Sequence, residues 1–195
     1  LTPVSKLVFK KIDISDFDII ISCGRKSVIP SIYLKKSSKK KIFNIHIQDP
    51  KVSLGNFDLV IAPEHDNLIG KNVITSKGAI HYLTLDEIKN NHNYLADKLK
   101  KNHEYILLVL GGPNKYYDYE DQNLINIFGI IKKILNKNNL QAIVIPSMRT
   151  PKKTINLANQ HLGLENLVIN NVDKKAYLSG LSLAKYIVVT CDSTS

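Results

Sequence analysis

The chain has 195 residues, of which 44% are hydrophobic and 23% charged, and its formal net charge is +10 at pH 7. This size suits one large or two small globular domains, and no apolar run approaches the roughly 20 residues that a membrane-spanning helix needs. The two cysteines argue against a disulfide framework or a zinc site and favour a cytoplasmic location, with peripheral contact to a membrane left open.

The positive charge comes almost entirely from lysine. The densest basic run, residues 35–41, is broken by Ser37 and Ser38 and contains no interleaved aromatic residue. A nucleic-acid-binding surface would need basic residues clustered into a defined patch. We therefore expect a solvated, lysine-rich surface and no nucleic-acid partner.

The first half of the chain alternates short apolar runs with polar or helical stretches. Strands are predicted at residues 18–22, 41–47, 57–62 and 73–76, and a helix at residues 26–36. The runs are apolar throughout instead of alternating, which is typical of strands covered on both faces of a sheet.

A different pattern follows in the middle of the chain. Thr84-Leu85-Asp86-Glu87 is a capping box and predicts a helix that runs to about Lys101. Because this stretch is polar and has few apolar anchors, we expect an exposed connector. The predicted organisation is a first domain over residues 1–88, a connector over 89–103 and a second domain over 104–195.

The second half repeats the alternation more clearly. Strands are predicted at residues 105–110, 141–145, 167–169 and 186–190, with helices beginning near residues 121, 151 and 174. Strands alternating with helices indicate the α/β class with parallel sheets. We expect two Rossmann-like domains. The chain begins at Leu1 and stops at Ser195, just after a strand, so we also expect a fragment with both domains truncated.

Only two of the 27 basic residues are arginines, Arg25 and Arg149, and both follow the end of an apolar, strand-like run. Open α/β sheets bind ligands at the carboxyl ends of their strands, and a guanidinium holds phosphate or carboxylate through two parallel hydrogen bonds. Both arginines are therefore predicted to bind anions, with chance placement near turns as the alternative.

Three polar turns of the second half are further candidates. Gly111-Gly112-Pro113-Asn114 would let backbone amides approach a phosphate, but it lacks the dinucleotide-binding spacing, so a structural turn remains an alternative. Ser147-Met148-Arg149-Thr150 opens a helix whose free amides would assist the arginine. Residues 190–195 are rich in hydroxyl groups, and a helix cap explains them equally well.

In the first half, His65-Asp66 follows a predicted strand. One of the two is a candidate general base, with ordinary turn chemistry as the alternative. Adjacent side chains diverge in extended backbone, so we expect one of them, and not a direct His-Asp dyad, to contact a substrate.

Taken in order, these motifs resemble the mitochondrial-fission "elongated mitochondria" family over nearly the whole chain. The likeness runs from Ile21-Ser22-Cys23-Gly24-Arg25 through Gln48-Asp49-Pro50, Pro63-Glu64-His65-Asp66, Gly111-Gly112-Pro113-Asn114 and Pro146-Ser147-Met148-Arg149 to Thr190-Cys191-Asp192-Ser193. The family comprises plant mitochondrial fission factors and bacterial relatives of unsettled function. It is similar in architecture to GT-B glycosyltransferases, in which two facing Rossmann-like domains hold a nucleotide-sugar in the cleft.

The resemblance implies a nucleotide side formed by Gly111, Gly112, Asn114, Ser147, Arg149, Thr190, Asp192, Ser193 and Ser195. Arg25, Asp49, His65 and Asp66 would face this side from the first domain. The implied function is binding of a nucleotide-sugar or similar phosphorylated ligand, with a metal-independent glycosyl transfer and no cofactor. The alternative is a non-enzymatic adaptor that recruits the division machinery through a protein partner. A nucleotide-sugar epimerase is disfavoured by the missing dinucleotide fingerprint.

Overall fold

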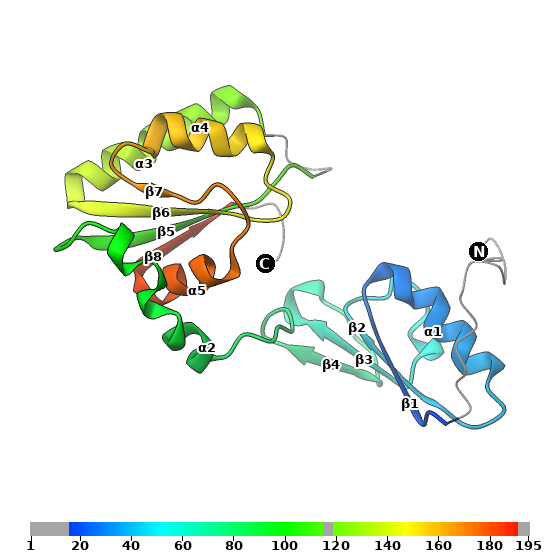
Figure 1. Cartoon of the computed structure of the whole chain (residues 1–195). Helices are drawn as coiled ribbons and strands as arrows, with labels where there is room; N and C mark the ends of the chain where they lie inside the picture. Colours follow the sequence, from blue (N-terminus) through cyan, green and yellow to red (C-terminus); the bar gives the residue numbers. More distant parts are fainter. Residues whose placement is uncertain (1–15, 115–118, 191–195) are drawn as a thin grey trace. The chain divides into compact units, whose positions relative to one another are not determined.

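A computed structural model describes residues 16–114 and 119–190 of the chain (Figure 1). The chain divides into two compact units, Leu1–His81 and Tyr82–Ser195. Each unit contains a four-stranded sheet in which every neighbouring pair of strands is parallel. This confirms the predicted α/β class and is consistent with two GT-B-like domains.

The sheet of the first unit has the order β1-β2-β3-β4. Its strands are β1 (Ile19–Cys23), β2 (Phe43–Ile47), β3 (Leu59–Pro63) and β4 (Val73–Ser76). Helix α1 (Arg25–Ser37) joins β1 to β2, and the 3-10 turns η2 (Leu54–Asn56) and η3 (Glu64–Asp66) lie in the following connections. The carboxyl ends of all four strands therefore lie at one edge of the sheet.

The core of the first unit is small and partly polar. Val28 of α1 packs with Phe57 and Val60, all three of them buried. On the same face of the sheet, His46 is fully buried, and its Nδ1 lies 2.8 Å from Ser22 Oγ. Buried polar groups of this kind lower the apolar area available to stabilise the unit.

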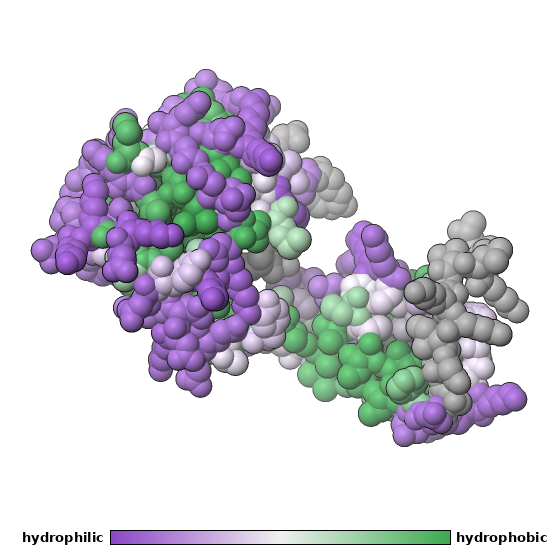
Figure 2. Space-filling model, viewed as in Figure 1, coloured by the Kyte–Doolittle hydropathy of each residue, from purple (hydrophilic) through white to green (hydrophobic). Residues whose placement is uncertain are grey.

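The opposite face of this sheet is apolar and exposed. Ile21 is 66% exposed, and Ile19, Phe43 and Ile74 are each exposed by more than 40%. Figure 2 shows hydrophobic side chains gathered over these strands. The prediction of strands covered on both faces is therefore wrong for this unit. An apolar run shows that a strand has side chains suited to burial, but it does not show whether a helix packs on each face of the sheet.

The sheet of the second unit has the order β7-β6-β5-β8. Its strands are β5 (Glu104–Leu110), β6 (Leu140–Pro146), β7 (Leu167–Val168) and β8 (Ala184–Val189). Its helices are α2 (Leu85–Asn90), α3 (Asp121–Asn138), α4 (Lys152–Leu162) and α5 (Lys174–Leu183), with 3-10 turns η4 (His92–Tyr94) and η5 (Ala96–Lys98).

Two apolar clusters cover the two faces of this sheet. Phe128 of α3 and Leu162 of α4 pack on one face with Leu108. Ala176 of α5 packs on the other face with Leu107. Figure 1 shows α3 and α4 on one side of the sheet and α5 on the other.

The segment between the two sheets differs from the predicted long helix. Thr84 caps α2 by accepting a hydrogen bond from the Glu87 amide, as the capping box predicts, but α2 ends at Asn90. The amide of Leu95 donates to Ser179 Oγ at 3.1 Å instead of to a helical carbonyl, and Leu95 is fully buried. Although the sequence of this segment is polar, Leu95 anchors the segment to α5.

Candidate functional site

The carboxyl ends of β5 and β8 form a topological switch point. Helix α3 leaves β5 on one face of the sheet, whereas α5 leads into β8 from the other face. The strand order β7-β6-β5-β8 reverses between β5 and β8, and open α/β sheets bind ligands outside the carboxyl ends of the strands at such points. The Gly111 amide donates to Thr190 Oγ1 at 2.8 Å and so ties the two strand ends together.

Gly112 makes room for the neighbouring loop. A Cβ atom added at Gly112 would lie 2.1 Å from the carbonyl oxygen of Arg149, well inside contact distance. The loop after β6 is further bound to the end of β5, because Leu110 O accepts from the Ser147 amide at 2.9 Å and from Thr150 Oγ1 at 2.6 Å. Gly112 therefore serves the close packing of two loops.

The turn at residues 147–150 is held by its own side chains. The Ser147 amide donates to Thr150 Oγ1 at 2.8 Å, and the Arg149 amide donates to Ser147 Oγ at 3.2 Å. Pro151 occupies the N-cap position of α4, without a side-chain cap. The Thr150 hydroxyl takes part in the strand-end turn and does not cap the helix.

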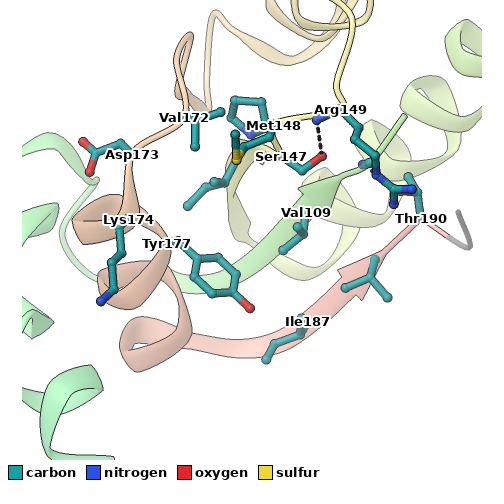
Figure 3. Close-up of a pocket in the computed structure, with 14 residues that line it drawn as sticks. Val109, Ser147, Met148, Arg149, Val172, Asp173, Lys174, Tyr177, Ile187 and Thr190 are labelled. Carbon is teal, nitrogen blue, oxygen red and sulfur yellow. Dashed lines mark hydrogen bonds between the residues drawn. The ribbon is translucent and has the colours of Figure 1, made fainter. Parts of the chain in front are cut away.

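A cavity of about 460 Å³ opens at these strand ends, on the α5 side of the sheet. Its walls are mainly apolar, with Val109, Pro146, Val172 and Ile187 among them. Its polar lining residues are Ser147, Arg149, Asp173, Lys174, Tyr177 and Thr190. Figure 3 shows the Arg149 guanidinium beside Thr190.

The first turn of α5 forms the wall opposite the Arg149 loop. Asp173 caps this helix, since its carboxylate accepts from the Ala176 amide at 3.1 Å. Its second oxygen accepts from the Tyr94 hydroxyl at 2.9 Å. Burial raises the pKa of Asp173, but these hydrogen bonds outweigh burial and leave the pKa below its ordinary value.

The structure brings together part of the predicted nucleotide side. Four predicted residues line the cavity, namely Gly111, Ser147, Arg149 and Thr190. Gly112 lies against the Arg149 backbone, and neither it nor Asn114 is among the lining residues. Asp192, Ser193 and Ser195 lie outside the described residues.

The lining residues that the sequence reasoning missed include Val172, Lys174 and Tyr177. A signal was available, because all three fall at the start of the helix that leads into the switch-point strand. Nothing local in the sequence, however, distinguishes this helix start from the others.

In the first unit, the predicted residues lie at the carboxyl ends of three adjacent strands. Arg25 is the first residue of α1, directly after β1, and Asp49 follows β2. Asp49 accepts from the Lys51 amide at 2.9 Å and from Lys51 Nζ at 2.5 Å. Burial raises the pKa of Asp49, but the bonds from Lys51 and the charge of Arg25 together lower it below its ordinary value.

Backbone strain accompanies this turn. Gln48 and Lys51 have φ angles of 85° and 54°, a backbone region that residues other than glycine seldom adopt. Such strain persists only where surrounding contacts enforce it, and it clusters at functional loops. Lys51, which holds Asp49 in place, was not predicted from the sequence.

His65 and Asp66 lie in the 3-10 turn η3 after β3, not in extended backbone as expected. Their side chains approach each other, with His65 Nε2 3.7 Å from Asp66 Oδ1. This distance is too long for a hydrogen bond. The role of either residue as a general base stays a prediction, as does the expectation that this set faces the second unit.

Residues 16–114 and 119–190 include no helix with the length and hydrophobicity to cross a bilayer. In the same part of the chain, no three His, Cys, Asp or Glu side chains gather closely enough to hold a metal ion.

Comparison with known proteins shows two relatives. The uncharacterized protein RP120 of Rickettsia prowazekii (strain Madrid E) is 24% identical over 223 residues, which cover 91% of this chain and 60% of RP120. The mitochondrial fission protein ELM1 of Arabidopsis thaliana is 35% identical over 48 residues, or 25% of this chain and 11% of the plant protein. The chain thus spans less than two thirds of the length of either relative.

The family model described as mitochondrial fission ELM1 matches residues 3–195, which is nearly the full sequence. The match extends through both parallel sheets and includes the loops that form the cavity in the second unit. On this evidence, the chain belongs to the mitochondrial fission ELM1 family.

Proposed function

We propose that the second unit binds a nucleotide-sugar, or a similar phosphorylated ligand, in the cavity at the carboxyl ends of β5, β6 and β8. The observation that carries this proposal is the position of the cavity at the switch point, with Arg149 and Thr190 at its rim. Ligands of open α/β sheets bind at such points.

The chemistry of the walls supports a phosphorylated ligand with an apolar or aromatic part. A guanidinium matches the oxygens of a phosphate group, and the hydroxyls of Ser147 and Thr190 add further hydrogen-bonding groups. The apolar walls would hold a nucleoside, and about 460 Å³ is within the range of small-molecule sites.

In the enzymatic form of this proposal, the bond between the sugar carbon and the diphosphate oxygen breaks as an acceptor oxygen bonds to that carbon. Arg149 stabilises the growing charge on the departing diphosphate. The acceptor proton passes to His65 or Asp66, whose side chains are 43% and 28% exposed and so are open to a substrate.

Calorimetric titration with uridine and adenosine diphosphates tests the binding step. Arg149→Ala removes the charge-assisted hydrogen bonds to phosphate, which are stabilising by about 1.5–3 kcal/mol. We therefore expect an affinity roughly tenfold to a hundredfold lower. Lys133→Ala is the matched control, since it removes the same charge from the exposed surface of α3. Equal affinity of the Arg149→Ala variant and the unmodified chain would refute the proposal.

A second candidate function is a non-enzymatic adaptor that recruits division machinery. The observation that favours it is the exposed apolar face of the first sheet, where Ile21 is 66% exposed. Apolar patches of this kind mark interaction sites. The test is capture of a partner in the absence of nucleotide. Capture that survives Arg149→Ala but is lost with Ile21→Glu supports the adaptor, and the reverse pattern contradicts it.

A further inference from the structure

Lys174 lines the cavity, but its charge is engaged elsewhere. Lys174 Nζ lies 2.5 Å from Glu87 Oε1 of α2 and 4.7 Å from the centre of the Tyr82 ring. Figure 3 shows its side chain directed away from Ser147 and Arg149, which stand on the opposite wall. The pair with Glu87 raises the pKa of Lys174, so the ammonium is charged at neutral pH.

We infer that Lys174 is a second phosphate-binding cation of this cavity, and that Glu87 competes with the ligand for it. The inference rests on the proposed function and names a residue that regulates the same site. An incoming diphosphate draws the ammonium from Glu87 into the cavity, so that cations from both walls hold the ligand.

The geometry makes this exchange feasible. Lys174 and Glu87 are 49% and 32% exposed, and solvent screens exposed ion pairs so strongly that they contribute little to stability. A lysine carries its charge on a flexible four-carbon stem, so the ammonium can change partners without movement of α5. Asp173, in contrast, uses both carboxylate oxygens to fix the start of α5 and Tyr94.

The exchange also has a consequence for α2. Glu87 and Tyr82 are the residues of this segment that contact Lys174, and they lie directly after the boundary between the units at His81. The later part of the segment has its own ties to α5, from the Leu95 amide to Ser179 Oγ and from Ser179 Oγ to His92 O. Ligand binding would therefore loosen α2 and leave residues 92–95 in place.

Titration with pyrophosphate and uridine diphosphate tests the inference. Glu87→Gln frees Lys174, so we expect tighter binding by up to about fivefold, the factor that corresponds to 1 kcal/mol. Lys174→Gln weakens binding. The double variant Glu87→Gln/Lys174→Gln binds like Lys174→Gln alone, because Glu87 has no lysine left to hold back from the ligand. Hydrogen exchange of the α2 amides becomes faster when saturating uridine diphosphate is added, whereas exchange at residues 92–95 does not.

Glu104→Gln is the matched control. Glu104 pairs with Lys185 at 2.6 Å at the amino end of β5, away from the cavity, and the variant has the same change in net charge as Glu87→Gln. It should leave the affinity unchanged. Equal tightening by Glu104→Gln, or tightening by Glu87→Gln that persists without Lys174, would show a general charge effect and overturn the inference.

The two proposals fail in different ways. Absence of diphosphate binding by the unmodified chain, or binding that is indifferent to Arg149→Ala, refutes the proposed function and this inference together. Binding that depends on Arg149 but is unaffected by Glu87→Gln and Lys174→Gln refutes only the role of Lys174.

Discussion

Replacing Gly112 by alanine tests how the cavity is built. The added Cβ would lie 2.1 Å from Arg149 O and 2.7 Å from its carbonyl carbon, whereas ordinary contacts begin at 3.4 Å. Both nearby atoms belong to the backbone, so no side-chain rotation relieves the clash. The loop over residues 147–150 must move by about 1 Å or more from the end of β5.

This displacement has a calculable cost. Overpacking in a close contact costs about 1–3 kcal/mol. The hydrogen bonds to Leu110 O from the Ser147 amide and Thr150 Oγ1 would also lengthen, and each contributes about 1 kcal/mol. We therefore expect the free energy of unfolding of the second unit to fall by about 2–4 kcal/mol, together with a weaker diphosphate affinity.

Gly129→Ala is the matched control for this measurement. Gly129 lies in α3, and a Cβ added there meets nothing within 4 Å. Alanine is favoured over glycine inside a helix, so this variant should be more stable by about 0.5–1 kcal/mol. Urea unfolding, followed with diphosphate titration, measures both effects. A Gly112→Ala variant as stable as the unmodified chain, with equal affinity, would refute the packing argument.

Three further predictions concern stability. Burial lowers the pKa of His46 by more than the charge of Asp49 raises it, so the pKa in the folded state lies below 6.5. Because the unfolded chain then binds the proton more readily, the first unit should lose stability as the pH falls below about 6.5. Urea unfolding of His46→Leu should not show this loss. Burial raises the pKa of Asp58, but hydrogen bonds from the Asn44 amide and Lys35 lower it by more, so the pKa lies below 3.8. Asp58→Asn should therefore lower the free energy of unfolding by about 1–2 kcal/mol at pH 7. This difference from the unmodified chain should disappear in acid, where Asp58 is protonated. Leu95→Ala should destabilise the second unit by about 2–5 kcal/mol, as judged by hydrogen exchange, whereas the exposed Leu164→Ala should not.

Much of the fold could be predicted from local patterns. Apolar runs located the strands of both sheets, and the capping box located the start of α2 at Thr84. The helix predicted to begin near residue 121 is α3, and two of its apolar residues, Ile127 and Ile134, are each more than 45% exposed. The end of α2 was missed, since the competing bond of the Leu95 amide goes to a residue 84 positions away.

The candidate site was only partly accessible from the sequence. Arg149 stood out because the chain has so few arginines, and Gly111 and Thr190 because they follow apolar strands. Lys51 and Lys174 did not stand out, since they are two among many lysines. Lys51 is distinguished by its contact with Asp49, two residues away, whereas Lys174 is distinguished only by its tertiary contact with Glu87.

The sequence by itself determined the order of strands and helices and the positions of the polar turns, because apolar runs, caps and turns depend on neighbouring residues. Only the tertiary structure decided that the Gly112 backbone meets Arg149, that Lys174 pairs with Glu87, and that one face of the first sheet stays exposed. These outcomes depend on contacts between residues far apart in the chain. No local pattern carries that information.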